Sequence, residues 1–311
     1  MKPRLSGIFA ALLTPRDASG KVDYELHDTL VDFVLARGVD GVVIGGGTAE
    51  YPHLELADRK ELISRTVRSF QGRGLVLASI GTSSIQTTLR LGEHAVIAGC
   101  TALLLPMPYF FRYEQHDLKA FCEVVCRTLP APILLYNLPS FTNPLAVETA
   151  IELLEAEQNL VGIKDSSGDR GSLMKLAEAR SRGDFSLLIG DDSVLLDALT
   201  AGWDGVVSGI VCFVPELVGV LHRNFRTGNH QMALASQALL HDLIPNLLRL
   251  PIPWGIRVGL AARGLSAGEF ALPLSDLRKQ QVAAFHAWLP AWFSRAPEGL
   301  AWIALGAGRV F

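Results

Sequence analysis

The chain has 311 residues, of which 49% are hydrophobic and 19% charged, so it can bury a large core and contains no tract of disordered composition. Its formal net charge of -3 argues against a basic surface patch and against nucleic acid as a partner. No apolar run approaches the ~18 residues that cross a bilayer, and the first residues lack the hydrophobic region of a signal peptide. We therefore expect a globular, cytoplasmic protein with no membrane partner.

The residues that bind metals most often show no metal-binding pattern here. The four cysteines match no zinc-binding spacing and fit a reducing compartment as free thiols. The eight histidines are scattered without the pairing of metal ligands. We predict that the protein holds no metal.

Short apolar runs recur along the first two thirds of the chain, at residues 7–14, 41–45, 75–81, 102–106, 132–136, 160–164, 186–190 and 205–210. Continuous apolar runs without alternation are typical of strands that are covered on both faces, as in a parallel sheet. The segments between them carry apolar residues at helical spacing, as residues 58–67 illustrate. Eight strand and helix units favour a closed (β/α)8 TIM barrel, an α/β fold, over an open doubly wound sheet.

After the eighth run the pattern becomes helical, with breaks at Pro245 and at residues 251–253. We predict that residues 1–220 form the barrel, which carries the active site. Residues 221–311 would then form a C-terminal helical extension packed on the barrel. The end of the chain is unusually apolar and contains Trp288, Trp292 and Trp302, so we expect it to be buried against the barrel or a subunit partner.

Lys164 is the one lysine among seven that falls in an apolar strand. Catalytic groups of TIM barrels come from the C-terminal ends of the strands, where Lys164 is expected. Burial disfavours the charged form of an amine, and a neutral amine can attack a carbonyl to form a Schiff base. The alternative is a lysine that extends from the strand end to water or pairs with Asp165.

Other predicted strand ends add groups that suit imine chemistry. The backbone N–H groups of the glycine turn at residues 45–47, with the hydroxyl of Thr48, could hold a carboxylate, although a tight turn without ligand explains the glycines equally well. Tyr136 could act as general acid and base, or could be a packed aromatic ring. Asp191 and Asp192 could bind a metal or a polyol, but such a pair usually caps a loop or helix.

Three motifs then carry a resemblance to the dihydrodipicolinate synthase and N-acetylneuraminate lyase family of class I aldolases, over essentially the whole chain. Residues 46–50 are similar to the family motif G-x-T-G-E, residues 136–139 to Y-N-x-P, and residues 162–168 to G-[IL]-K-[DE]-[ST]-[ST]-G. The order and spacing of the three make the resemblance specific.

The resemblance implies a role for each matching residue. Lys164 would form an imine with the keto carbon of pyruvate or a related 2-oxo acid, and Tyr136 would relay protons. Gly47 and Thr48 would hold the carboxylate, and Ile210 would line the pocket. The covalent imine on Lys164 would make a cofactor unnecessary.

Three positions depart from the synthase branch of that family. Gly47 stands where the synthases have a threonine of the proton relay, and Phe110 stands where they have a tyrosine supplied by the neighbouring subunit. Phe141 replaces an arginine that holds the carboxylate of the aldehyde substrate, and an apolar ring cannot replace a guanidinium. Phe110 and Phe141 are thus expected in the substrate pocket of an enzyme that is not a true dihydrodipicolinate synthase.

These observations predict a Schiff-base lyase or aldolase that makes or breaks a C–C bond between a 2-oxo acid and a second partner, which is an aldehyde, a keto-sugar acid or an aromatic aldehyde. Two alternatives remain: dehydration of a keto-deoxy sugar acid through the same imine, and a catalytically weak homologue that binds a 2-oxo acid. The resemblance also implies a homo-oligomer, either a dimer or a tetramer.

Overall fold

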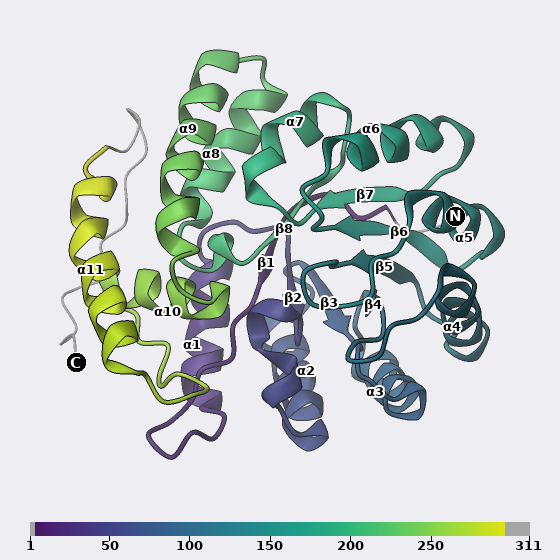
Figure 1. Cartoon of the computed structure of the whole chain (residues 1–311), viewed down its shortest axis with the longest axis horizontal. Coiled ribbons are helices and arrows are strands. Elements are labelled where there is room, and N and C mark those ends of the chain that lie inside the picture. Colours follow the sequence, from purple (N-terminus) through teal and green to yellow (C-terminus); the bar gives the residue numbers. More distant parts are fainter. Residues whose placement is uncertain (1–3, 296–311) are drawn as a thin grey trace.

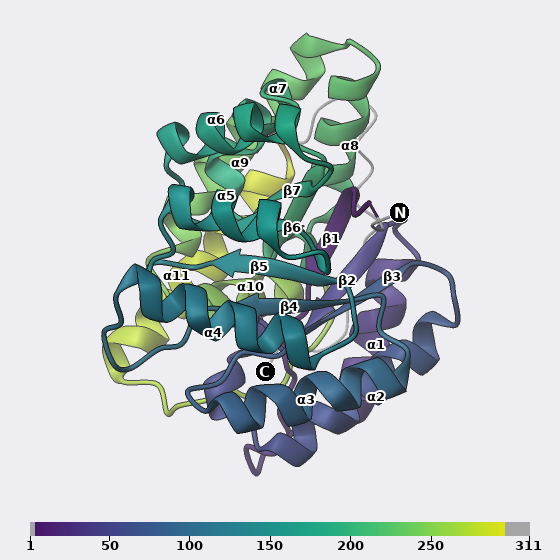
Figure 2. The same ribbon diagram turned by 90° about the vertical axis from the view of Figure 1, so that its right-hand side faces the viewer.

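The computed structural model describes residues 4–295, in which eight parallel strands close into a barrel in chain order (Figures 1 and 2). Each strand pairs with the next, and β1 pairs with β8. The strands are β1 (Gly7–Ala11), β2 (Gly41–Ile44), β3 (Leu75–Ser79), β4 (Ala102–Pro106), β5 (Ile133–Asn137), β6 (Leu160–Asp165), β7 (Ser186–Ile189) and β8 (Gly205–Ser208). Each overlaps one of the apolar runs, so the predicted TIM barrel is confirmed.

A helix follows each strand and packs around the outside of the barrel (Figure 1). These helices are α1 (Tyr24–Leu35), α2 (Leu56–Phe70), α3 (Ile85–Ala98), α4 (Gln115–Thr128), α5 (Val147–Ala156), α6 (Arg170–Ala179), α7 (Leu195–Thr200) and α8 (Pro215–Arg226). Three more follow, α9 (His230–Leu247), α10 (Ile252–Ala262) and α11 (Asp276–Phe293). The division expected between residues 220 and 221 falls inside α8, the last helix of the barrel.

Alternate residues of the strands belong to two separate apolar cores. The inner core consists almost entirely of strand side chains, among them Phe9, Leu104 and Leu134. The outer core contains the intervening strand residues together with the apolar faces of the helices. This division follows from strand geometry, because successive side chains point to opposite faces of the sheet. The barrel interior is therefore filled, and a site can form only at its ends.

The C-terminal helices pack against the barrel and against one another. Trp292 of α11 is buried, and its indole N–H donates to the carbonyl of Leu239 in α9 at 3.2 Å. The rings of Trp288 and Trp292 are stacked with their centroids 6.1 Å apart. The described apolar end is thus buried along one face, at Phe285, Leu289 and Trp292, whereas its other side is exposed to solvent. Trp302 lies outside the described residues. No helix within residues 4–295 has both the length and the apolar character to cross a membrane.

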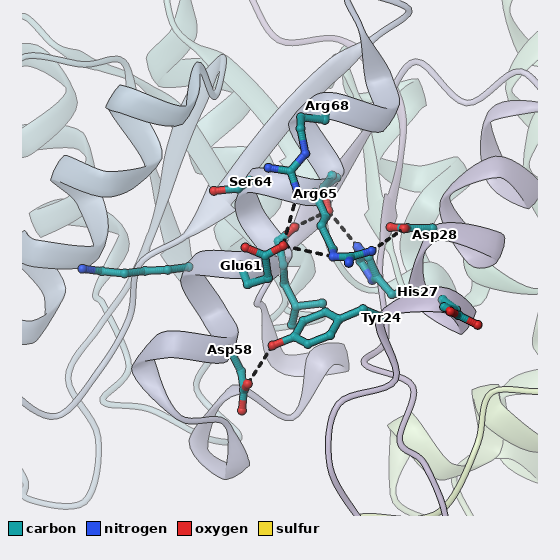
Figure 3. Close-up of polar contacts among 12 residues, drawn as sticks. Tyr24, His27, Asp28, Asp58, Glu61, Ser64, Arg65 and Arg68 are labelled. Carbon is teal, nitrogen blue, oxygen red and sulfur yellow. Dashed lines mark hydrogen bonds and ion pairs between the residues drawn. The ribbon is translucent and has the colours of Figure 1, made fainter.

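A polar network joins α1 to α2 on the outside of the barrel (Figure 3). Arg65 donates hydrogen bonds to Asp28 at 2.7 Å and to Glu61 at 3.0 Å, and Tyr24 donates to Asp58 at 2.8 Å. Burial and the hydrogen bond to Asp58 raise the pKa of Tyr24 to about 12. These groups pair with one another and do not line the cavity described below, so we assign them a structural role.

Candidate active site

A β-bulge in β6 determines where Lys164 points. Ile133 of β5 pairs with Leu160, whereas the next residue, Leu134, pairs with Gly162, so Val161 is one extra residue in β6. Val161 belongs to the inner core, and strict alternation along the strand would place Ile163 there as well. Ile163 instead belongs to the outer core, because the bulge shifts the alternation by one residue. The bulge therefore turns Lys164 into the barrel instead of toward the helices.

Gly162 makes this bulge possible. A Cβ atom at this position would lie 2.1 Å from the carbonyl oxygen of Ser186 on β7. This distance is too short for any residue with a side chain. The glycine of the third motif is thus explained by packing: it lets the two strands approach at the point where β6 changes register.

Lys164 lies beside Tyr136 in the interior of the barrel. The two residues are register partners on β6 and β5, and the Lys164 Nζ is 3.9 Å from the centroid of the Tyr136 ring. Both are 4% exposed. Asp165 does not pair with the lysine: its carboxylate accepts hydrogen bonds from Ser167 and from Asn137. Burial raises the pKa of Asp165, and these hydrogen bonds oppose that shift.

The Gly-Gly-Thr turn after β2 lies against the same tyrosine. Residues Gly47–Ala49 form a short 3₁₀ turn, and a Cβ atom at Gly47 would be 3.8 Å from the Tyr136 hydroxyl. The Thr48 hydroxyl approaches the backbone after β8, since a Cβ at Gly209 would lie 2.9 Å from it. The structure thus brings Gly47, Thr48, Tyr136 and Lys164, which come from three separate segments, to one end of the barrel.

Glu50 fixes the end of this turn to the C-terminal helices. Its backbone is left-handed, with φ 54°, which is uncommon for a residue with a side chain. The buried Glu50 carboxylate accepts a hydrogen bond from the Trp254 indole at 3.3 Å and lies 3.6 Å from the Arg257 guanidinium. Burial lowers the pKa of Arg257 to about 10, and Glu50 opposes this shift. Helix α10 therefore takes part in positioning the turn.

These residues line one cavity of about 590 Å³, a size typical of small-molecule sites. Six of the seven residues predicted for the site lie on its wall, namely Gly47, Thr48, Tyr136, Phe141, Lys164 and Ile210. Phe110 does not line the cavity of this single chain. Its side chain is 87% exposed and packs edge-on against Phe111, with ring centroids 5.0 Å apart. Its φ of 83° is a strained backbone conformation for an aromatic residue.

Part of the cavity wall was missed by the sequence analysis. The junction between α9 and α10 contributes an apolar wall made of Ile244, Leu247, Leu248, Pro251, Ile252 and Pro253. Tyr51 and Tyr109 add two rings that meet edge-on, with centroids 5.7 Å apart. The breaks at residues 251–253 were visible in the sequence, but nothing in them indicated contact with the site.

Two carboxyl groups after β7 also reach the cavity. Asp191 caps the following turn, because its Oδ1 accepts from the backbone and hydroxyl of Ser193. Asp192 is buried, and its Oδ2 accepts from the Ser208 hydroxyl at 2.8 Å, while Oδ1 has no hydrogen-bond partner. Burial raises the pKa of Asp192 to about 7. Among residues 4–295, no group of three or more His, Cys, Asp or Glu side chains could hold a metal ion.

Comparisons with known proteins agree with this geometry. The model of the "Dihydrodipicolinate synthetase family" matches residues 4–291. The 4-hydroxy-tetrahydrodipicolinate synthase of Sorangium cellulosum is 35% identical over 285 residues, which cover 90% of this chain and 94% of that protein. The enzyme of the same name from Bacillus subtilis is 31% identical, over 88% of this chain and 94% of its own.

A solved structure gives the same result. The 4-hydroxy-tetrahydrodipicolinate synthase of Methylacidiphilum fumariolicum SolV superposes with a TM-score of 0.88 and 30% identity, over 94% of this chain and 97% of that one. Because these matches extend over nearly the whole chain, the protein belongs to the dihydrodipicolinate synthetase family of aldolases and lyases.

Proposed function

We propose that the protein is a class I aldolase in which Lys164 forms an imine with pyruvate or a related 2-oxo acid. The observation that carries the proposal is the position of the buried Lys164 amine, 3.9 Å from the centroid of the Tyr136 ring, on the wall of the cavity. The imine withdraws electrons from the neighbouring carbon, which is the task that a metal or cofactor performs in other aldolases. The proposed reaction therefore needs no cofactor.

The surrounding groups support the individual steps. Backbone N–H groups of the Gly47–Ala49 turn and the Thr48 hydroxyl would hold the carboxylate of the 2-oxo acid. The Lys164 amine would attack the C2 carbonyl, and water would leave with protons that pass through the Tyr136 hydroxyl. Loss of a proton from C3 gives an enamine, which attacks the aldehyde carbon. Hydrolysis then releases a 4-hydroxy-2-oxo acid and restores the free amine.

We also propose that this reaction differs from the one that gives the curated relatives their name. Phe141 stands where the synthase branch has an arginine, and no arginine of the described chain lines the cavity. A second substrate carboxylate would then be buried without a guanidinium partner, which is costly. Dehydration of a keto-deoxy sugar acid through the same imine is the alternative use of these groups.

The oligomeric state stays a prediction, as does the cytoplasmic location. We propose a homodimer or homotetramer in which Phe110 is covered by a neighbouring subunit. The exposed rings of Phe110, Phe111 and Tyr113 in the loop between β4 and α4 support this, since monomers rarely expose such a cluster. Light scattering behind gel filtration would measure the mass, and a strictly monomeric protein would contradict the proposal.

Borohydride reduction in the presence of a panel of 2-oxo acids tests the main proposal. Reduction traps the imine as a stable secondary amine, so intact mass should increase with pyruvate, and peptide mapping should place the adduct on Lys164. Lys175, a surface lysine that pairs with Glu148, is the matched control: Lys175→Ala should be labelled like the wild type. A protein that gains no mass with any 2-oxo acid, or that is labelled on another lysine, would disprove the assigned chemistry.

A further inference from the structure

Three large apolar side chains line the cavity and are nevertheless open to solvent. Phe141 is 64% exposed, Leu248 is 54% exposed and Ile252 is 37% exposed. They come from two parts of the fold: Phe141 follows β5, whereas Leu248 and Ile252 belong to the junction of α9 and α10. Exposed apolar side chains around a concave site favour a ligand that covers them, because covering them removes apolar surface from water.

The charges around the cavity favour the same kind of ligand. Apart from Lys164, which the imine consumes, His53 is the one other basic side chain on the wall formed by the described residues, which also carries the carboxyl groups of Glu50, Asp191 and Asp192. The buried Arg59 nearby is engaged elsewhere: it donates to the carbonyls of Gly81 and Ser79 at 2.8 Å. The described wall therefore offers an anionic group on the second substrate no arginine, and no lysine other than Lys164.

We infer that the second substrate is an uncharged aldehyde with an aromatic body. This inference rests on the proposed function, because the aldehyde would be the acceptor of the pyruvate-derived enamine. C3 of the enamine forms the new C–C bond to the aldehyde carbon, and the carbonyl oxygen takes a proton from the Tyr136 hydroxyl. Water then hydrolyses the imine, so pyruvate and the aldehyde are consumed one to one.

The aromatic rings of the wall give the ligand its shape preference. Tyr51, Tyr109 and Phe141 line the cavity together with Tyr136, which already contacts Lys164. Aromatic side chains pack onto another ring edge-on or with an offset stack, and each such pair adds to the contribution of burial alone. A flexible polyol would have to give up water on this apolar wall and would find few partners there.

Aldehydes of similar size but different character provide the test. Benzaldehyde, glyceraldehyde and aspartate semialdehyde are each combined with pyruvate, and the condensation product is measured by mass. We expect kcat/KM for benzaldehyde to exceed the values for both others by at least about tenfold, since one well-placed apolar contact gives discrimination of this size. Equal or better turnover of glyceraldehyde or aspartate semialdehyde would overturn the inference.

Two leucines, one within α9 and one directly after it, provide matched variants. Leu248 follows the last residue of α9 and lines the cavity, whereas Leu234, within α9 and 60% exposed, does not. Leu248→Asn should lower kcat/KM for benzaldehyde by about tenfold, and Leu234→Asn should leave it unchanged. If the two variants show the same kcat/KM, the apolar wall does not select the substrate.

Borohydride trapping with pyruvate tests the imine on Lys164 separately from the choice of aldehyde. If the pyruvate adduct forms on Lys164 but benzaldehyde is not preferred, the proposed function stands and the substrate inference fails. If no adduct forms with any 2-oxo acid, both fail. Trapping in Leu248→Asn should match the wild type, because the substitution changes neither Lys164 nor the Gly47–Ala49 turn that would hold the pyruvate carboxylate.

Discussion

Lys164 and Tyr136 face each other across the β5 and β6 pairing, with the lysine Nζ 3.9 Å from the centroid of the tyrosine ring. The face of an aromatic ring attracts a cation, whereas removal from water disfavours any charged group. The ring also keeps the flexible lysine side chain in one place next to a proton donor. A substrate carbonyl bound at the amine is therefore also close to the group that can move its protons.

Replacing Lys164 should abolish turnover without unfolding the protein. Lys164→Ala lacks the amine, and Lys164→Arg retains a guanidinium that stays protonated and cannot form an imine. Circular dichroism and thermal melting should show a folded barrel in both, while a coupled assay should detect no product. Wild-type activity in Lys164→Ala would refute the imine mechanism.

Tyr136→Phe should lower kcat by about 10²- to 10⁴-fold, the usual size of a general acid and base contribution. This substitution keeps the ring over Lys164 and removes only the hydroxyl, so pyruvate trapping should decrease much less than turnover. Single-turnover rates and borohydride trapping on the same variant separate the two effects. A decrease of less than tenfold in kcat would move the proton transfer to another group or to water.

The barrel could be predicted from the sequence because each of its strands is a continuous apolar run, and helical segments separate these runs. Lys164 could be identified because a lysine in such a run contradicts its surroundings. Its direction could not be predicted, since strict alternation from Val161 would have turned it toward the helices. The bulge at Val161 and Gly162 depends on contacts with β5 and β7, which are distant in sequence.

The apolar wall shows a second limit of sequence reasoning. In the sequence, Leu247 and Leu248 look like any helical leucines that fill a core. Only the path of α9 over the barrel brings them to the cavity. Phe110 shows a third limit, because a residue that we propose is covered by a neighbouring subunit cannot be placed from one chain. Local patterns therefore identified the groups at the strand ends, but not the groups that arrive from distant helices.

Gly47→Ser should add a hydroxyl group next to Tyr136 without disturbing the fold. A Cβ atom at Gly47 has ordinary contacts, 3.6 Å from Leu138 and 3.8 Å from the Tyr136 hydroxyl. Gly47→Ala is the matched control, since it adds the same Cβ without the hydroxyl. If a proton relay is incomplete here, kcat of the serine variant should exceed that of the alanine variant by about tenfold. Equal kcat values would show that Tyr136 exchanges protons without such help.

Asp192 should make the protein less stable as the pH rises. Burial raises its pKa to about 7 in the folded protein, above the ordinary value of 3.8, so between these values the folded state holds a proton that the unfolded state has released. The free energy of unfolding therefore decreases across this window and levels off above it. The asparagine of Asp192→Asn cannot ionise, so its free energy of unfolding should not decrease in this way. Relative to the wild type, the variant should therefore become more stable by at least about 1.4 kcal/mol as the pH rises through this window, the equivalent of one pKa unit.

Urea unfolding of both proteins at about pH 4.5 and about pH 7.5 measures this gain. The same substitution at Asp276, a surface residue of α11 whose side chain is 92% exposed, is the control and should show no such gain. A constant difference between Asp192→Asn and the wild type at both pH values would mean that Asp192 is already ionised in the folded protein at the lower pH.

Glu50→Ala should weaken both the fold and the binding of pyruvate. It removes the acceptor of the Trp254 indole and leaves the buried Arg257 without its carboxylate, and breaking such a pair typically costs about 3 to 5 kcal/mol. Because Glu50 directly follows the Gly47–Ala49 turn, KM for pyruvate should rise more than kcat falls. Glu50→Gln keeps an oxygen that can accept from Trp254, so its stability and its KM for pyruvate should lie between those of the alanine variant and the wild type. An unchanged KM in a less stable Glu50→Ala protein would restrict Glu50 to a purely structural role.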